Sequence, residues 1–435
     1  MSTSLPTLHG NDGERDRFIA ALRSDASLWS DFSALCSFGG RLAGTQSERE
    51  SQAWCAARLG AVLPGVDARQ DLTRYAGWTC LAAELVDLGS GARLDAVPLL
   101  GTASTPEGGL EVEVLDVGRG TPDQIRAAGD MLQGRAVLVT HEYPFSSGTI
   151  HRRIKLAAAQ EAGAAAFLIA QPESGVGPVS GSSGRGGGSG IPAMGISSEA
   201  GIALRQPRSR VRLHIAGEDH PDLSTRTLVL DLPGRGPDRI VVSAHIDGHP
   251  LAESAIDNAT GVAAALALAR AAAPFMERME RGLTVCIFSA EEWALQGSRA
   301  WIAGLDLEAR NSMRLNLNLD SLAGSDRLTV LTSGFPALGP FFQDAASACG
   351  QELAAHLPLM PNSDHANFAA VGIPAARLLA GFDEPGSLLR LLLTRADTRA
   401  LVDPRTLQNA CLGAGALVWA ALTASDSEIT ALAQR

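Results

Sequence analysis

Acidic side chains and a histidine follow three consecutive apolar segments in the second half of the chain. Each comes directly after an apolar run: His245 and Asp247 after 239–244, Glu291 and Glu292 after 283–288, and Asp320 after 314–319. Asp257, in the segment 257–261, opens the apolar stretch that lies between the first two runs. In an open α/β sheet the chemistry sits beyond the carboxyl ends of the strands. We therefore expect one imidazole and several carboxylates to gather at a single sheet edge.

Such a gathering of carboxylates requires a cation. Buried like charges cost several kcal/mol unless they are neutralised. Imidazole and carboxylate ligands suit zinc or a similar divalent ion, and an Asp that bridges two ions holds them roughly 3.5 to 4 Å apart. A glutamate that is not a ligand can act as general base. The neighbours Glu291 and Glu292 can supply both roles, because successive side chains that leave a strand point in different directions.

Each element of this pattern also has a simpler interpretation. The segment His245–Ile246–Asp247 could be a surface turn, and an acidic pair such as Glu291–Glu292 favours the first turn of a helix. Asp257 could be a helix N-cap. The order of all these residues after three consecutive strands favours a metal site.

The elements that position these residues indicate an α/β protein. From 228 onward, strand-like runs at 239–244, 283–288 and 314–319 alternate with apolar helical stretches. This alternation predicts a mostly parallel sheet that is sandwiched by helices on both faces. The segment 16–63 has a helical pattern, with turn residues at 38–41 and 43–45.

The middle of the chain is predicted to be a smaller inserted domain of α/β or β-rich character. It contains the strand candidates 135–140 and 164–170 and a helical segment at 154–163. The Gly/Ser-rich stretch 175–190 is expected to be a surface loop, long enough to serve as a lid or simply a linker. The predicted division is 1–92 and 217–435 for the two parts of a catalytic domain, and 93–216 for the insert.

Composition excludes several classes of protein. The 435 residues are 46% hydrophobic and 19% charged, which argues against disorder, and the net charge of -11 argues against a nucleic-acid or anionic-membrane partner. The six cysteines form no C-x-x-C pair and fit buried thiols. The polar segment 1–17 lacks the order of a secretion signal, and the apolar stretch 261–275 is interrupted by Arg270. We expect a cytoplasmic protein.

Several motifs resemble the zinc exopeptidases that include aminopeptidase Y, glutamate carboxypeptidase and, more distantly, the glutaminyl cyclases. The matching segments are 40–45, 243–247, 255–262, 288–292 with 297–300, 318–320, 363–368 and 372–374. The insert resembles a protease-associated (PA) domain. The resemblance extends from about Phe38 to Asp397.

The resemblance implies a role for each matching residue. His245 and Asp320 would bind one zinc ion, Asp257 would bridge, Glu292 would bind a second ion and Glu291 would be the base. Asp247 would orient His245. The implied reaction is hydrolysis of the N-terminal bond of a peptide or aminoacyl substrate by water held at the metal.

The last ligand of the family is missing. Relatives carry a His in the pattern H-T-x-x-D-T, whereas this chain has Leu393 at the first position of 393–398. Three residues could compensate: His365, otherwise a substrate-side or structural residue, His249, otherwise a surface residue, and Arg395 with its fixed charge. The only tyrosines, Tyr75 and Tyr143, precede the main catalytic segment, which removes a phenolic donor for an oxyanion.

Two main functions remain open at this point. The first is an aminopeptidase with one zinc ion, or with a weak second one, that uses Glu291 as base. The alternative is a catalytically impaired or inactive relative that binds peptides, because Leu393 replaces the last ligand. A third, weaker interpretation is an amide-forming cyclase, which would need an aromatic-lined pocket.

Overall fold

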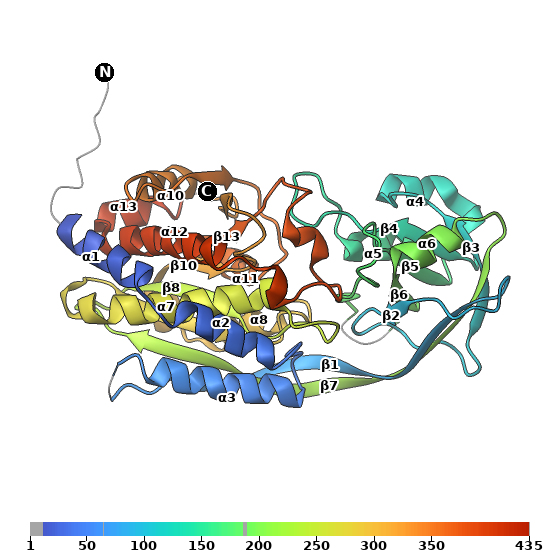
Figure 1. Cartoon of the computed structure of the whole chain (residues 1–435), viewed down its shortest axis with the longest axis horizontal. Helices are drawn as coiled ribbons and strands as arrows, with labels where there is room; N and C mark the ends of the chain where they lie inside the picture. The colour runs from blue at the N-terminus through green and yellow to red at the C-terminus, as the bar shows by residue number, and fades with distance from the viewer. Residues whose placement is uncertain (1–11, 64, 186–188, 435) are drawn as a thin grey trace, which may run out of the picture.

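Two long antiparallel strands connect the two parts of the molecule. The computed structural model describes residues 12–63, 65–185 and 189–434, so most of the polar segment 1–17 lies outside the described residues. Strands β1 (Arg69–Asp87) and β7 (Arg210–Leu232) pair from Arg69 opposite Val229 to Asp87 opposite Val211. They run side by side along the molecule and join a larger part to a smaller one (Figure 1).

The larger part contains the predicted mostly parallel sheet. Its strand order is β12-β11-β13-β10-β8-β9-β7, with β8, β9, β10 and β13 parallel and β7 and β11 antiparallel to their neighbours β9 and β13. The three predicted strands are confirmed as β8 (Arg239–His245), β9 (Gly282–Phe288) and β10 (Met313–Leu319). The remaining strands are β11 (Leu328–Leu331), β12 (Leu353–His356) and β13 (Ala375–Ala380).

Helices cover this sheet. The predicted N-terminal helical region is divided into three helices, and the third begins at Thr45, whose side chain accepts a hydrogen bond from the Glu48 N–H. The helices of this part are α1 (Asp12–Arg23), α2 (Leu28–Ser37), α3 (Gln46–Gly60), α7 (Thr260–Ala272), α8 (Gln296–Gly304), α9 (Leu307–Ser312), α10 (Leu338–Ser347), α11 (His365–Ala370), α12 (Pro404–Thr423) and α13 (Asp426–Ala431). Shorter helical turns are η2 (Ala255–Ala259), η3 (Ala273–Arg278), η4 (Leu388–Leu391) and η5 (Arg399–Leu401).

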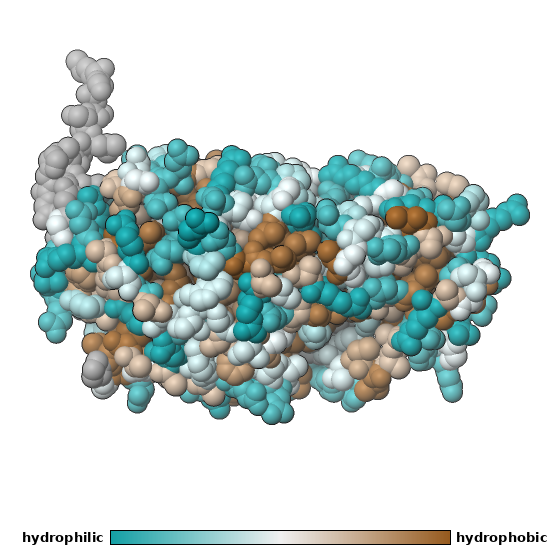
Figure 2. All heavy atoms as spheres, viewed as in Figure 1, coloured by the Kyte–Doolittle hydropathy of each residue, from teal (hydrophilic) through white to brown (hydrophobic). Residues whose placement is uncertain are grey.

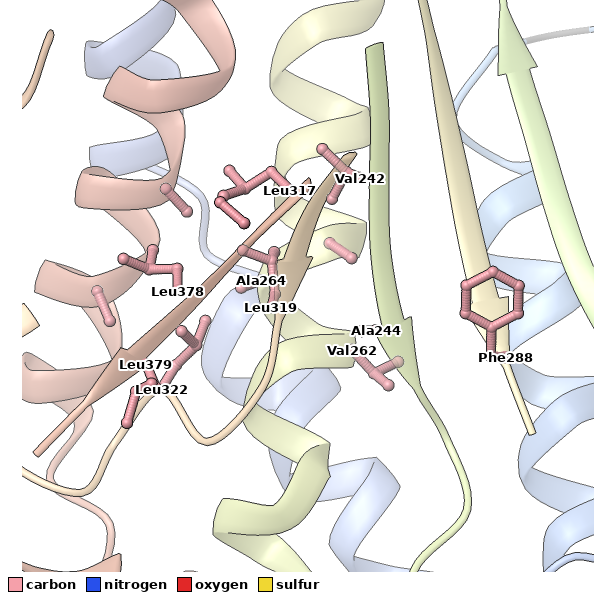
Figure 3. Packing of buried hydrophobic residues seen from close by; sticks show 14 of the residues in the cluster. Val242, Ala244, Val262, Ala264, Phe288, Leu317, Leu319, Leu322, Leu378 and Leu379 are labelled. Carbon is pink, nitrogen blue, oxygen red and sulfur yellow. The ribbon is translucent and has the colours of Figure 1, made fainter. Parts of the chain in front are cut away.

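The core lies between α7 and the central strands. Val262 of α7 lies beside Ala244 of β8, and Leu317 of β10 lies beside Val242 of β8 (Figure 3). Every residue of α7 except Arg270 is buried. The helical run Ala255–Arg278 is long and apolar enough to cross a membrane, but 83% of its apolar window is buried inside the protein. This run is thus a buried core segment, and its helix α7 packs against the central strands.

The smaller part has its own strands and helices. The predicted strands are confirmed as β4 (Ala136–Thr140) and β5 (Ala166–Ala170), and the predicted helix as α5 (Arg152–Glu161). The other elements are β2 (Ala96–Pro98), β3 (Leu110–Asp116), β6 (Ala193–Ile196), α4 (Pro122–Ala128), α6 (Ser198–Leu204) and the turn η1 (Gly129–Leu132). Strand β7 continues without interruption through the predicted boundary at 216/217.

Part of the Gly/Ser-rich segment lies inside the protein. The segment was expected on the surface, but Val179 is fully buried and Ser180 and Ser182 are 3% and 7% exposed. The Ser180 N–H donates a hydrogen bond to the Leu393 carbonyl at 2.7 Å. The surface prediction is therefore wrong for 179–183, because this stretch packs between the two parts, and residues 186–188 lie outside the described residues.

A buried arginine braces the loop that follows β8. Arg41 is fully buried and donates hydrogen bonds to five backbone carbonyls, those of Leu35, Gly39, Ile246, Glu253 and Ser254. Beside it, a Cβ on Gly40 would lie 2.1 Å from the His249 carbonyl oxygen, so a larger residue would push this loop away. The motif 40–45 thus holds the chain between β8 and α7 in place.

We expect Arg41→Met to destabilise the protein by at least about 3 kcal/mol, because it leaves several buried carbonyls without a donor. Urea denaturation would measure the change. Arg405→Met, at an arginine whose side chain is 90% exposed, is the matched control and should change the free energy of unfolding little. Equal stability of the two variants would contradict the bracing role.

Candidate metal centre

The structure brings three of the predicted ligands together. His245 ends β8, Asp257 lies in η2 and Asp320 follows β10. His245 Nε2 is 3.1 Å from Asp257 Oδ1 and 3.7 Å from Asp320 Oδ1. One ligand atom from each of the three residues lies within 4.8 Å of the others. This arrangement places one nitrogen and two carboxylate oxygens around a common point.

The protonation of His245 shows why this point requires a cation. His245 Nδ1 lies 2.9 Å from the Asp247 carbonyl oxygen, which can only accept, so Nδ1 carries a hydrogen. Nε2 faces Asp257 and Asp320, is buried, and makes no hydrogen bond of proper geometry with any described residue. Burial alone would lower the pKa of His245, but Glu291 and the surrounding aspartates raise it well above its ordinary value. Without a metal ion, the raised pKa means that Nε2 carries a proton toward Asp257 and Asp320. A nitrogen that faces two carboxylates fits a divalent ion with nitrogen and oxygen ligands, which would bind in place of that proton.

Asp247 acts on more than His245. The sequence predicted that Asp247 would orient the imidazole. Its backbone carbonyl lies 2.9 Å from His245 Nδ1, and its carboxylate Oδ1 lies 3.7 Å from the same nitrogen. Its carboxylate oxygens accept the backbone N–H groups of Glu291 at 3.2 Å and Glu292 at 3.1 Å. The side chain therefore fixes the turn after β9 and couples it to the turn after β8.

Glu291 and Glu292 line the cavity beside the three ligands. Burial raises the pKa of both carboxyl groups well above the usual value, and the negative charges of nearby acidic side chains raise it further. Glu292 is 6% exposed, and its Oε1 has no hydrogen-bond partner in the part of the chain that the structure describes. Glu292 does not belong to the three-residue ligand group.

Arg377 contacts the centre and was missed by the sequence analysis. It is 1% exposed, and its Nη2 lies 3.0 Å from Asp320 Oδ2. Its guanidinium also lies over the ring of Phe145, 4.8 Å from the centroid. Burial would raise the pKa of Asp320, but Arg377 and His245 lower it below its ordinary value. A single arginine within the apolar run of β13 was the available signal, although its target could not be read from it.

Asp397 holds the backbone next to a ligand. Its carboxylate accepts the N–H of Ile256 at 2.7 Å and that of Asp257 at 3.3 Å. Burial raises the pKa of Asp397 to about 7. The segment 393–398 thus still supports the centre through Asp397, even though Leu393 offers no ligand.

None of the three predicted substitutes joins the ligand group. His249, expected on the surface, is fully buried, and neither of its ring nitrogens has a hydrogen-bond partner among the described residues. His365 is also fully buried, and burial lowers the pKa of both imidazoles to about 3, so both are neutral. Arg395 forms a bidentate pair with Asp95 at 2.7 and 2.8 Å instead of entering the site. The prediction for Arg395 is wrong because its side chain connects two surface segments.

The ligands face a small cavity between the two parts of the molecule. The cavity has a volume of about 70 Å³, and Arg152 and Arg153 of the smaller part line it together with four acidic residues, Asp257, Glu291, Glu292 and Asp320. A larger cavity of about 1020 Å³ lies next to it and shares Arg153 and Asn362 with it. On the face shown in Figure 2, apolar side chains gather near the middle of the molecule.

We predict that the metal-free protein loses stability as the pH rises from about 6.5 to 8. Burial raises the pKa of Asp364 and Asp397 to about 7, and that of Glu291 and Glu292 well above normal. The folded state therefore retains carboxyl protons that the unfolded chain releases near pH 4. Four histidines whose pKa is strongly lowered by burial act in the opposite direction, but only below about pH 6.5, where the unfolded chain protonates them: His141, His151, His249 and His365. The expected loss is a few kcal/mol, because one unit of pKa shift is worth about 1.4 kcal/mol.

Urea denaturation in EDTA at the two pH values would test this loss. Zinc should restore stability at the higher pH, because it binds the folded state. A metal-free protein that became more stable over this range would show that these carboxyl groups are not buried as described.

Parts of the chain match two known protein families. Residues 227–416 match peptidase family M28, and residues 102–204 match the PA domain. Aminopeptidase YwaD of Bacillus subtilis is 25% identical over 389 residues, which are 88% of this chain and 81% of that protein. Carboxypeptidase Q of Bos taurus is 25% identical over 359 residues, 76% of this chain and 71% of that protein.

A solved structure agrees with the fold. The structure of BSAP, a zinc aminopeptidase from Bacillus subtilis, has a TM-score of 0.71 at 24% identity and covers 92% of this chain and 96% of its own. These matches support a metallopeptidase of a zinc exopeptidase family with an inserted PA domain.

Proposed function

We propose that this protein is a zinc-dependent aminopeptidase that uses Glu291 as general base. The observation that carries the proposal is the buried Nε2 of His245, which faces Asp257 and Asp320 with Glu291 lining the same cavity. The similarity to aminopeptidase YwaD supports the direction of cleavage. Zinc bound by His245, Asp257 and Asp320 would supply Lewis-acid chemistry, polarising a carbonyl and making a water more acidic.

In this proposal, side chains of the protein accept the proton and bind the substrate. The raised pKa of Glu291 suits a base that accepts a proton from water near neutral pH, and Asp247 fixes its backbone. The cavity acids, among them Asp257, Glu292 and Asp320, favour the positive charge of a free peptide amine. The small cavity matches a terminal residue, and the adjoining cavity of about 1020 Å³ leaves room for the rest of a peptide.

The alternative function is peptide binding with little or no turnover. Leu393 lines the cavity at the position where the family's last ligand was expected, and it is 8% exposed. A leucine adds apolar surface to a binding site but cannot hold a cation. Only a catalytic assay distinguishes this function from the first.

We expect Glu291→Gln to lower kcat for aminoacyl anilides by about 10²- to 10⁴-fold, because the amide cannot accept the proton. Zinc content, measured by plasma mass spectrometry, should not change, since Glu291 is outside the ligand group. Glu308→Gln, on the exposed helix α9, is the matched control. An N-terminally acetylated peptide should resist cleavage by the wild-type protein.

Each outcome identifies a function. Equal rates for the wild type and Glu291→Gln would overturn the role of Glu291. Cleavage of the acetylated peptide would overturn the aminopeptidase assignment. Tight peptide binding without turnover by the zinc-loaded wild type would establish the alternative.

A further inference from the structure

The centre offers a second cation too few ligands. Within the described residues, the one group with three ligand atoms inside 4.8 Å is His245, Asp257 and Asp320. The cavity beside Asp257 is also lined by Glu292 and by Leu393, which has no donor side-chain atom. The Leu393 carbonyl is also engaged, because it accepts the hydrogen bond from Ser180. His151 lines the same cavity, but its Nδ1 accepts a hydrogen bond from the Arg153 N–H. Among the described residues, Glu292 belongs to no group of three ligand atoms within 4.8 Å, so a second ion lacks the three-residue cradle of the first.

An arginine of the PA domain reaches this same space. Arg152 begins α5 and lines the small cavity together with Asp257 and Glu292. Its Nε donates to the Ser182 carbonyl at 3.0 Å. A Cβ on Gly181 would lie 2.1 Å from Nη2 and 2.2 Å from Cζ of Arg152, so the guanidinium fills a space that only glycine leaves open. The segment 180–182 thus donates a hydrogen bond to the Leu393 carbonyl and also holds the Arg152 side chain in place.

The charge of Arg152 acts on the acids that a second ion would otherwise neutralise. Burial and the neighbouring Arg153 lower the pKa of Arg152 to about 10, while Glu292, Glu291 and Asp257 act in the opposite direction. Arg152 therefore remains positive at neutral pH. Among the described residues Arg152 forms no ion pair of 4.0 Å or less with these carboxylates, although it lines the same cavity as they do.

We propose that the Arg152 guanidinium takes the place of a second metal ion, and that each chain binds a single divalent ion. The PA domain then contributes a positioning charge to the active site. This inference rests on the proposed function, in that it needs the ion held by His245, Asp257 and Asp320. Arginine is suited to the role because it stays charged and presents several donors in a fixed plane.

The test restores the missing ligand and removes the arginine. Leu393→His is compatible with the backbone, because Leu393 has a φ of 63° and His adopts that region more readily than Leu. Zinc binding would be titrated against a chromophoric chelator in Leu393→His/Arg152→Met and in Leu393→His/Arg153→Met. Arg153 is the matched control, because it lines the same cavity and its charge acts on Glu291 rather than on Glu292 or Asp257.

We expect one zinc equivalent in the wild type. The second equivalent should bind at least about tenfold more tightly in the Arg152→Met double variant than in the Arg153→Met one, because a repelling charge is gone. Equal second-site affinities, or two tight equivalents in the wild type, would overturn the inference and leave the metallopeptidase function intact.

Two further results complete the test. No bound zinc in the wild type would overturn the proposed function and this inference with it. If Arg152→Met fails to fold, as judged by circular dichroism, Arg152→Gln in the same background provides the same comparison.

Discussion

The site depends on one electrostatic constraint, which is that His245 Nε2 faces two buried carboxylates. Asp257 and Asp320 lie 3.1 and 3.7 Å from this nitrogen. The Asp247 carbonyl accepts the hydrogen on Nδ1, which leaves Nε2 as the nitrogen available to a metal ion. Without an ion, a proton on Nε2 offsets the two carboxylates, and a bound metal ion would take its place.

Much of the surrounding structure keeps these groups in place. Arg41 fixes the loop after β8 through five carbonyls, and Asp397 binds the backbone of Asp257. Arg377 balances Asp320 from β13. The carboxylate of Asp247 accepts a hydrogen bond from the Glu291 N–H and so fixes the turn after β9. Buried charges are costly unless they are paired or hydrogen-bonded, so the contacts of Asp247, Asp320 and Asp397 let these acidic residues remain inside the protein.

The PA domain contributes residues to the cavity beside the metal ligands. The buried stretch 179–183 lies against Leu393, and Arg152 enters the catalytic cavity from α5. Both contacts lie where the family pattern loses its ligand. Leu393 and Arg152 line the same cavity, which is the basis of the proposal that the arginine replaces a second ion.

The sequence predicted the local features well and the long-range contacts poorly. The ends of β8, β9 and β10 could be predicted because apolar runs and the polar residues after them are local patterns. The contact between Arg377 and Asp320 depends on which strand neighbours β10, which no local pattern specifies. The burial of His249 and the outward pairing of Arg395 likewise follow from packing between segments distant in sequence.

The most direct test of the central claim is anomalous diffraction at the zinc edge from crystals grown with zinc. The account predicts an anomalous peak within coordination distance, about 2.0 to 2.2 Å, of His245 Nε2 and of one oxygen each from Asp257 and Asp320. A hydrogen bond from Nε2 to either carboxylate, with no anomalous peak between them, would contradict it.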